Sequence, residues 1–364
     1  MELINATKMQ AGYTMGMNPD GRESLVVVVK GTFQIPSYPD ETPPLAAKQA
    51  PLVDADIFTG EPGLSATVYE CDYPPFKPRC DVLLNGSAYG PKGRHVERVT
   101  VSMRVGDMSK SFDVVGERRW RSSMAGAYIT KIKQFVRMPF SYDNAYGGKD
   151  ESFDNPDKHK YFLANPFGVG FQVNTAKEAI HDKPLPNTEE TGRPVNSLVG
   201  KYRPMSFGPI ARSWAPRPKY AGTYDDQWFE NTFPFLPADF DERYFQAAPE
   251  DQQVDYLQGG EEVELRNLTP KGDCRFRVPE VSVPVEFMLR DYRSEKKRTV
   301  IDTLMIEPDL MRFTLCWRTS IPLKKNIFEV PMCVVGRMPK GWYRARALGK
   351  SYYSNLRELS ADRS

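Results

Sequence analysis

The sequence predicts a mainly β protein, with antiparallel β-sandwich-like sheets, long ordered loops rich in proline and aromatic residues, and a few short helices. Composition is the first reason: 31 prolines and 26 glycines among 364 residues favour short strands and turns over a helical bundle. Runs of β-branched and alternating apolar residues in the first and last thirds of the chain are the second. At this length, two domains or one large β architecture are expected.

The N-terminal region, residues 1–138, is predicted to be β-rich. Its expected strands span residues 24–35, 80–89, 95–105, 110–115 and 127–138. In the third of these, Val99, Val101, Met103 and Val105 alternate with polar neighbours, a pattern typical of a half-buried strand. So many short strands before residue 140 favour an antiparallel sandwich.

The middle region, residues 139–260, is predicted to be irregular, because Asp, Asn, Gly, Pro and aromatic residues replace the alternation. Ordered loops of such length in compact proteins are often functional. Short helices are expected at 224–231 and 239–247, and a further helical turn within 249–257. Asp225, Asp226 and Asp239 occupy cap and first-turn positions of these helices.

The C-terminal region, residues 261–364, returns to a strand pattern. Strands are expected at 261–268, 275–278, 281–290, 298–306, 312–321 and 327–335, followed by a helix at 345–359. No convincing internal repeat relates the two β-rich regions. The three regions are expected either as separate units or as one continuous domain.

The charge pattern argues against nucleic acid or a membrane as a partner. The chain has 49 Lys and Arg residues against 47 Asp and Glu, interspersed along its length. Local basic clusters at 118–121 and 296–298 are expected to be solvated turns. Five cysteines without a dense framework, and the lack of a signal peptide or spanning segment, predict a cytoplasmic protein.

Catalytic and cofactor motifs are not found, so the chain is predicted not to be an enzyme and to have no metal or cofactor. Cys71 and Cys80 have eight residues between them, which does not fit a zinc knuckle. His95, His159 and His181 are not paired with a nucleophile motif, and the glycine-containing runs lack the order of a phosphate-binding loop.

Carboxylates beside aromatic residues keep one catalytic alternative open. Asp225 with Asp226, and Asp239 with Asp241, lie among the aromatic residues Trp228, Phe229 and Tyr244. Such a combination occurs in glycoside hydrolases and sugar-binding modules. Helix capping explains the same acids without catalysis.

The segment 207–253 holds eleven aromatic residues and six prolines in 47 positions, without one His or Cys. It is suited to a stiff, ordered surface. Its motifs F-G-P-I-A-R-S-W (207–214), Y-A-G-T-Y-D-D-Q-W (220–228), P-A-D-F-D (237–241) and A-P-E-D-Q-Q (248–253) resemble those of a bacterial family of type VI secretion accessory proteins. The resemblance extends through K-P-R-C-D-V-L-L-N-G-S-A-Y (77–89), F-S-Y-D-N-A-Y-G-G (140–148), N-P-D-K-H-K-Y-F-L-A-N-P-F-G-V-G-F (155–171) and G-G-E-E-V-E-L-R-N-L (259–268), and covers most of residues 1–320.

This resemblance implies an adaptor or chaperone that is not an enzyme. Such a protein binds a PAAR-type effector or tip protein and promotes its loading onto the VgrG spike protein. Aromatic and arginine anchors dominate interfaces of this kind. The candidate partner-binding residues are Arg212, Trp214, Tyr220, Tyr224, Asp225, Asp226 and Trp228, although most rings of the segment are expected to brace the loops.

Two other functions remain open at this stage. One is a carbohydrate-active enzyme or sugar-binding module that uses Trp228 with Asp225 or Asp226. The other is a structural component that is secreted together with the spike. The sequence does not separate this component from an adaptor that stays in the cytoplasm.

Overall fold

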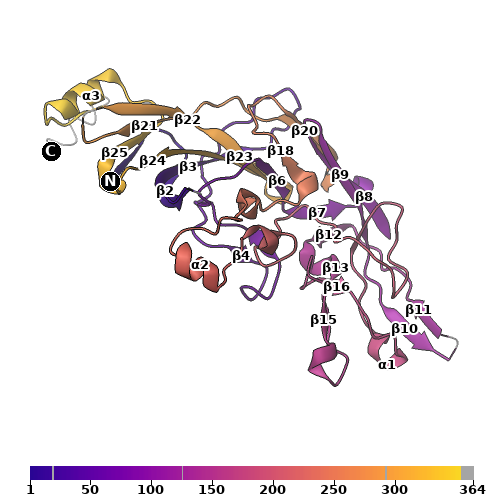
Figure 1. Cartoon of the computed structure of the whole chain (residues 1–364). Helices are drawn as coiled ribbons and strands as arrows, with labels where there is room; N and C mark the ends of the chain where they lie inside the picture. The colour runs from indigo at the N-terminus through magenta and orange to yellow at the C-terminus, as the bar shows by residue number, and fades with distance from the viewer. Residues whose placement is uncertain (19, 125, 292, 354–364) are drawn as a thin grey trace, which may run out of the picture.

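The computed structural model describes residues 1–18, 20–124, 126–291 and 293–353. Its largest sheet has six strands in the order β18-β6-β23-β24-β3-β2 and runs through the upper part of Figure 1. The only parallel pair in it is β6 with β23. The strands are β2 (Gln10–Met17), β3 (Glu23–Gln34), β6 (Cys80–Leu84), β18 (Gln253–Val254), β23 (Val300–Glu307) and β24 (Arg312–Pro322).

A second sheet has five strands in the order β17-β9-β8-β19-β20, all antiparallel. Its members are β8 (Arg98–Val105), β9 (Met108–Val115), β17 (Thr188–Glu189), β19 (Glu262–Thr269) and β20 (Gly272–Arg277). Strands from the N-terminal and C-terminal regions are therefore joined in one sheet, because β8 pairs with β9 on one side and with β19 on the other.

A third sheet lies at the end of the molecule where the N-terminus is found (Figure 1). It has the order β1-β25-β21-β22, with β1 (Glu2–Asn5), β21 (Pro284–Met288), β22 (Ser294–Arg298) and β25 (Met332–Val335). The remaining strands form two-stranded pairs: β4 (Ile57–Phe58) with β5 (Thr67–Tyr69), β7 (Gly86–Tyr89) with β12 (Arg137–Phe140), β10 (Trp120–Ser123) with β11 (Gly126–Ile129), β13 (Tyr146–Gly147) with β16 (Val169–Gly170), and β14 (Lys149–Asp150) with β15 (Lys160–Tyr161).

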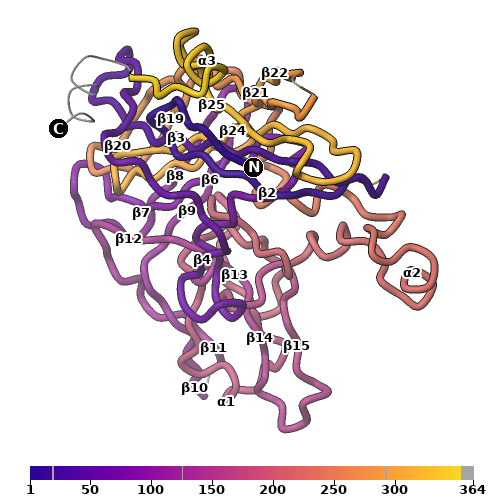
Figure 2. The backbone as a smooth tube through the Cα atoms, turned by 90° about the vertical axis from the view of Figure 1, so that its left-hand side faces the viewer, coloured from indigo at the N-terminus to yellow at the C-terminus, as the bar shows by residue number. Residues whose placement is uncertain are grey.

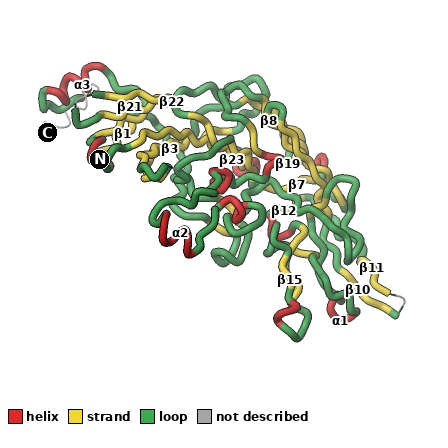
Figure 3. The backbone as a smooth tube through the Cα atoms, viewed as in Figure 1, coloured by secondary structure: helices red, strands yellow, loops and turns green. Residues whose placement is uncertain are grey.

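Helices are short, as the red segments of Figure 3 show. The α-helices are α1 (Lys177–Ile180), α2 (Asp226–Asn231) and α3 (Lys340–Ala347). Single 3-10 turns are η1 (Pro91–Gly93), η2 (Tyr142–Asn144), η3 (Pro156–Lys158), η4 (Arg217–Tyr220), η5 (Glu242–Phe245), η6 (Glu250–Gln252), η7 (Pro308–Leu310) and η8 (Ile327–Glu329). Among the described residues, no helix combines the length and apolar character needed to cross a membrane.

One apolar core joins the three large sheets. Its buried side chains include Val27 on β3, Phe112 on β9, Leu265 on β19, Phe313 on β24 and Phe287 on β21. The fold is therefore mainly β, with several antiparallel sheets and few short helices, as the composition and strand pattern predict. Burying apolar side chains from both ends of the chain in one core stabilises all three sheets together.

Most predicted strands are confirmed. The stretches at 24–35, 110–115, 261–268 and 312–321 form β3, β9, β19 and β24 within about two residues. The stretch at 95–105 begins later than expected, at Arg98, where its alternation begins.

Five predicted elements are wrong in form. The stretch 80–89 divides into β6 and β7, and the stretch 327–335 begins with the turn η8 and is a strand only as β25. The stretch 127–138 divides into β11 and β12 because its two ends pair with different partners, β10 and β7. The helix expected at 239–247 is only the single turn η5, which begins after the cap at Asp241. The predicted helix at 345–359 lies earlier, as α3, and its residues 354–359 fall outside the described part of the chain.

The two basic clusters are also not the solvated turns that were expected. Arg118 is buried and pairs with the buried carboxylate of Glu189. Lys296, Lys297 and Arg298 lie on β22, which is at the edge of its sheet. Exposed charges on an edge strand discourage pairing with a second chain.

Candidate partner-binding surface

The segment 207–253 divides into a part packed into the molecule and an exposed arm. We define the α2 arm as residues 221–240; it lies at one side of the molecule, away from the main body, in Figure 2. The flanking residues are held inside by two buried carboxylates, Asp81 and Glu70.

Asp81 on β6 anchors the end of the segment to the six-stranded sheet. Its carboxylate accepts hydrogen bonds from the backbone N–H groups of Ala247 (2.9 Å) and Ala248 (3.1 Å) and from the Gln246 side chain (2.6 Å). It also pairs with buried Lys77 at 2.7 Å. A buried charge is tolerated when it has such partners. The hydrogen bonds that compensate the Asp81 charge therefore also hold residues 246–248 in place.

Glu70 holds the start of the segment through two arginines. Arg212 Nε lies 3.2 Å from Glu70 Oε1, and Arg217 Nη2 lies 2.5 Å from the same oxygen. Arg217 is buried and also donates to the carbonyl oxygens of Ile210 (2.7 Å) and Tyr244 (2.8 Å). The Arg212 guanidinium is therefore engaged in bracing the loop.

Trp214 lies in the interior. Its side chain is fully buried and packs against Tyr142 and Phe167, with ring centroids 5.6 and 6.0 Å away. Trp214 is therefore not available as a contact residue for a partner, because other residues of the chain cover its ring. Of the eleven rings in the segment, only Phe207 and Trp214 are buried, so the expectation that most of them brace the loops stays a prediction.

Tyr220 marks the base of the arm. It is half-buried, and two cations lie over its ring, Arg243 at 4.4 Å and Lys219 at 4.8 Å from the centroid. Cation–π contacts of this kind stabilise the position of an aromatic ring. The Tyr220 carbonyl oxygen also accepts a hydrogen bond from the Asp241 N–H at 3.0 Å, which closes the arm at its base.

A second contact closes the arm one step further out. Asp239 accepts hydrogen bonds from the backbone and side chain of Thr223 at 2.9 and 2.7 Å, and these bonds lower the pKa of Asp239. Gly222, which directly precedes Thr223, has a φ of +82°, and a Cβ there would lie 2.9 Å from Pro237. Glycine is required for this turn.

The helix α2 begins where the sequence predicts. Asp225 has extended backbone and accepts a hydrogen bond from the Trp228 N–H at 2.8 Å, so it is the N-cap of the helix. The Trp228 indole N–H donates to the Phe235 carbonyl oxygen at 2.9 Å. This contact folds the second half of the arm back onto the helix.

Four aromatic side chains of the arm face solvent: Tyr224, Phe229, Phe233 and Phe235 are 54%, 65%, 59% and 45% exposed. Tyr224, Phe229 and Phe233 form one cluster with Trp228, since Tyr224–Trp228, Trp228–Phe233 and Phe229–Phe233 have centroid separations of 4.7, 5.7 and 5.6 Å. Exposed apolar clusters on this scale mark interaction sites more often than isolated exposed rings do.

The arm is acidic as well as aromatic. Residues 221–240 contain Asp225, Asp226, Glu230 and Asp239 and no Lys or Arg. A surface of this kind complements a partner with apolar side chains surrounded by basic ones.

Most of the acids proposed for a sugar-active site already have other partners. Asp225 caps α2, Asp239 holds Thr223, and Asp241 binds the Arg243 side chain. Asp226 is the one member of this set with no polar contact among the described residues. Glycoside hydrolysis uses two carboxylates. In each of the two pairs predicted from the sequence, at least one carboxylate is already hydrogen-bonded within the protein.

The structure thus brings together four of the seven candidate residues, Tyr224, Asp225, Asp226 and Trp228, on the arm. Tyr220 lies at its base, and Arg212 and Trp214 are used inside the molecule. Sequence reasoning missed Phe229, Phe233 and Phe235 as exposed residues. The sequence does contain an indication of their exposure: they lie around Pro234 and close to acidic residues, in a stretch where apolar and polar residues do not alternate.

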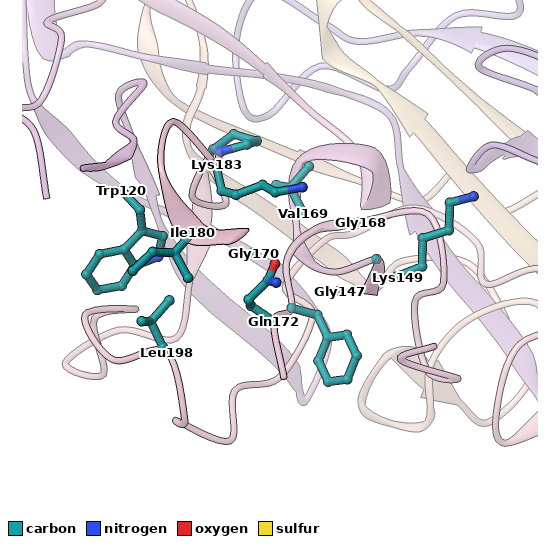
Figure 4. A pocket seen from close by; sticks show the side chains of 13 residues that line it. Trp120, Gly147, Lys149, Gly168, Val169, Gly170, Gln172, Ile180, Lys183 and Leu198 are labelled. Carbon is teal, nitrogen blue, oxygen red and sulfur yellow. The ribbon is translucent and has the colours of Figure 1, made fainter. Parts of the chain in front are cut away.

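A hollow of about 180 Å³ lies between two glycine-containing turns of the middle region (Figure 4). A Cβ on Gly147 would lie 2.2 Å from the Asn165 carbonyl oxygen, and one on Gly148 would lie 2.4 Å from that of Gly168. The nearby Lys149 pairs with Glu151 at 2.8 Å. These glycines therefore serve the close packing of two loops.

No group of three or more His, Cys, Asp or Glu side chains within the described ranges could hold a metal ion. The five cysteines are free thiols. Burial raises the pKa of the Cys71 and Cys80 thiols, which disfavours the thiolate.

Comparison with known proteins gives one family match. Residues 20–318 match the family model described as "Uncharacterized protein conserved in bacteria (DUF2169)". No curated protein and no solved structure matches the chain.

Proposed function

The chain belongs to this uncharacterized bacterial family, and from that premise we propose that it is a non-enzymatic adaptor of a type VI secretion system. In this proposal it binds a PAAR-type effector or tip protein in the cytoplasm and promotes its loading onto the VgrG spike. The motif resemblance described above supports the choice of secretion system. The exposed aromatic cluster of the α2 arm supports binding of a protein partner.

The α2 arm is the observation that carries the proposal. It presents exposed rings on a segment whose base is closed by hydrogen bonds and whose helix is capped. Aromatic residues held in place contribute large contact area at low entropic cost, which makes them frequent hot spots of interfaces. The acidic charge of the arm favours a partner surface that is basic and apolar.

Co-expression with the products of neighbouring genes tests this function. The tagged chain is purified with a PAAR-type effector and with VgrG, and the complexes are analysed by size-exclusion chromatography. We expect the triple variant Tyr224→Ser, Phe229→Ser, Phe233→Ser to weaken the complex at least about 10-fold, because each hot spot contributes about 2 kcal/mol or more.

The matched control is Tyr161→Ser with Phe328→Ser, which removes rings of similar exposure, 50% and 62%, outside the arm. The control should leave the complex intact. Failure of the wild-type chain to bind effector, tip protein or spike would reject the adaptor function. Recovery of the chain with VgrG in the culture supernatant would instead indicate a structural component that is secreted with the spike.

A further inference from the structure

A cavity of about 590 Å³, which we call the arm-base cavity, lies beside Tyr220. Its volume falls within the range of about 300–1,000 Å³ that is usual for ligand sites. Its walls come from segments far apart in sequence: Arg79 before β6, Lys110 on β9, Phe162 and Tyr202 in the middle region, and residues between Arg243 and Gln253. Figure 1 shows this middle region below the large sheets.

Lys110 gives the cavity a buried cation. Its side chain is only 5% exposed, and its ammonium lies 2.6 Å from Gln252 Oε1 and 3.1 Å from Asp251 Oδ1. An ammonium has three N–H donors, and these contacts use two of them. Burial lowers the pKa of Lys110 to about 8, because the attraction of Asp251 only partly offsets the loss of solvent around the ammonium.

Two arginines of the cavity wall are loosely held. Arg79 has a single contact with Asp255 at 3.4 Å, and Arg203 contacts Asp251 and Glu190 at 3.3 and 3.6 Å. Their side chains are about half exposed, and pairs of this kind contribute little to stability. Either guanidinium can therefore exchange its present partner for a ligand carboxylate at low cost.

The charge of the whole lining is positive. Five cationic side chains line the cavity against two carboxylates, Glu250 and Asp251. Two of the five have strong partners of their own: Arg217 binds Glu70, and Arg243 binds Asp241. Lys110, Arg79 and Arg203 remain as the group that can receive an anion.

The rest of the lining is aromatic and apolar. Phe162, Tyr202, Tyr220, Pro204 and Ile210 all contribute to the wall. Tyr202 lies edge-on to Tyr146 at 5.1 Å, so its ring is fixed by packing. A ligand that fits this lining carries an apolar group next to its negative charge, because each part finds its complement.

A polypeptide is the ligand that the position of the cavity favours. Tyr220 belongs both to the cavity wall and to the base of the α2 arm, and Arg243 lies just after the arm returns. A protein bound on the arm is thus placed to extend a segment into the cavity.

We propose that the arm-base cavity binds an acidic peptide segment of the partner protein, whose carboxylate contacts Lys110, Arg79 and Arg203. An apolar side chain next to the acidic residue lies against Phe162, Tyr202 and Tyr220. This inference rests on the adaptor function proposed above and names the second chemical feature that the partner must carry, beside its surface for the arm.

Selection from a phage-displayed library of random peptides tests the cavity directly. The full-length chain is the bait, in wild-type form and as the double variant Arg79→Gln, Arg203→Gln. We expect wild-type protein to enrich peptides with Asp or Glu beside an aromatic or aliphatic residue. The double variant is expected not to enrich them.

One enriched peptide is then synthesised with a fluorescent label, together with a version in which Gln replaces its acidic residue, and binding is measured by fluorescence anisotropy. Both the Gln peptide and the double variant should bind about 10-fold more weakly or worse, as expected for loss of a charged hydrogen bond. Arg266→Gln is the control, since Arg266 is similarly exposed and has one long contact, 3.8 Å to Asp273. Its affinity should equal that of the wild type.

The inference is overturned if no peptide is enriched, if the enriched peptides lack acidic residues, or if the double variant binds as tightly as the control. Its failure is distinct from failure of the adaptor function. A chain that forms the effector complex but selects no acidic peptide retains the function and loses the cavity site. A chain that selects acidic peptides but forms no complex with effector, tip or spike retains the site and loses the function.

Discussion

The buried side chain of Lys110 makes the free energy of unfolding depend on pH. Desolvation lowers its pKa from 10.5 to about 8, and attraction to Asp251 only partly opposes this effect. Between about pH 8 and 10.5 the unfolded chain therefore binds a proton at this position that the folded chain has released. Under that condition the free energy of unfolding rises with pH.

We predict that wild-type protein gains stability from Lys110 as the pH rises through this window, by up to about 1.4 kcal/mol per pH unit. Other groups titrate in the same range, so the comparison is with Lys110→Met, which keeps the stem and removes the amine. Urea denaturation at several pH values from 7 to 10 measures the difference between the two proteins. Identical pH dependence in both would show that the amine titrates normally.

The residue scale is also where prediction from the sequence was weakest. Trp214 and Phe229 lie in the same aromatic and proline-rich segment, yet Trp214 is fully buried and Phe229 is 65% exposed. Local composition predicts an ordered segment but contains no periodicity from which burial can be read. Burial of Trp214 depends on Tyr142 and Phe167, which are about 70 and 50 positions away in sequence.

Among single elements, the short helix α2 depends on its cap. It has only six residues and no buried one, and its own Phe229 is exposed, as are the nearby Tyr224 and Phe233, so the stability of the helix is local. Asp225 satisfies the Trp228 N–H, and this hydrogen bond determines where the helix begins.

We predict that Asp225→Ala destabilises α2 by about 1 kcal/mol, whereas Asp225→Asn retains most of the cap. Hydrogen exchange of the Trp228 amide measures this, and it should be about 5-fold faster in the Ala variant. The midpoint of global unfolding should barely change, because the arm lies outside the core. Equal exchange in the Ala and Asn variants would argue that the cap does not hold the helix.

At the same scale, regular strands were predictable and their interruptions were not. Alternation in β8 and the β-branched run in β3 follow directly from burial on one or two faces. The stretch 127–138 has a comparable pattern but divides, because β11 and β12 pair with different strands. Pairing partners are set by the whole topology and cannot be read from one stretch.

At the scale of the whole molecule, the two ends of the chain are parts of the same sheets. The strand β3 lies between β2 and β24, β6 lies between β18 and β23, and β8 lies between β9 and β19. Removing the C-terminal region would leave these three N-terminal strands with open edges and would remove many of the core side chains. The α2 arm, by contrast, begins and ends at one hydrogen-bonded base.

We therefore predict opposite results from two deletions. Residues 1–260 expressed alone should not fold, because β3, β6 and β8 each lose one of their two pairing partners and expose aggregation-prone edges. Replacing residues 222–239 by a short Gly-Ser linker should leave the fold and its unfolding temperature nearly unchanged, since the Tyr220–Asp241 contact already brings the ends together. Circular dichroism with thermal unfolding measures both, and the effector pull-down is repeated on the arm deletion. A folded fragment 1–260 would show that the N-terminal region has a core of its own, and an arm deletion that still binds the effector would place the contact surface elsewhere.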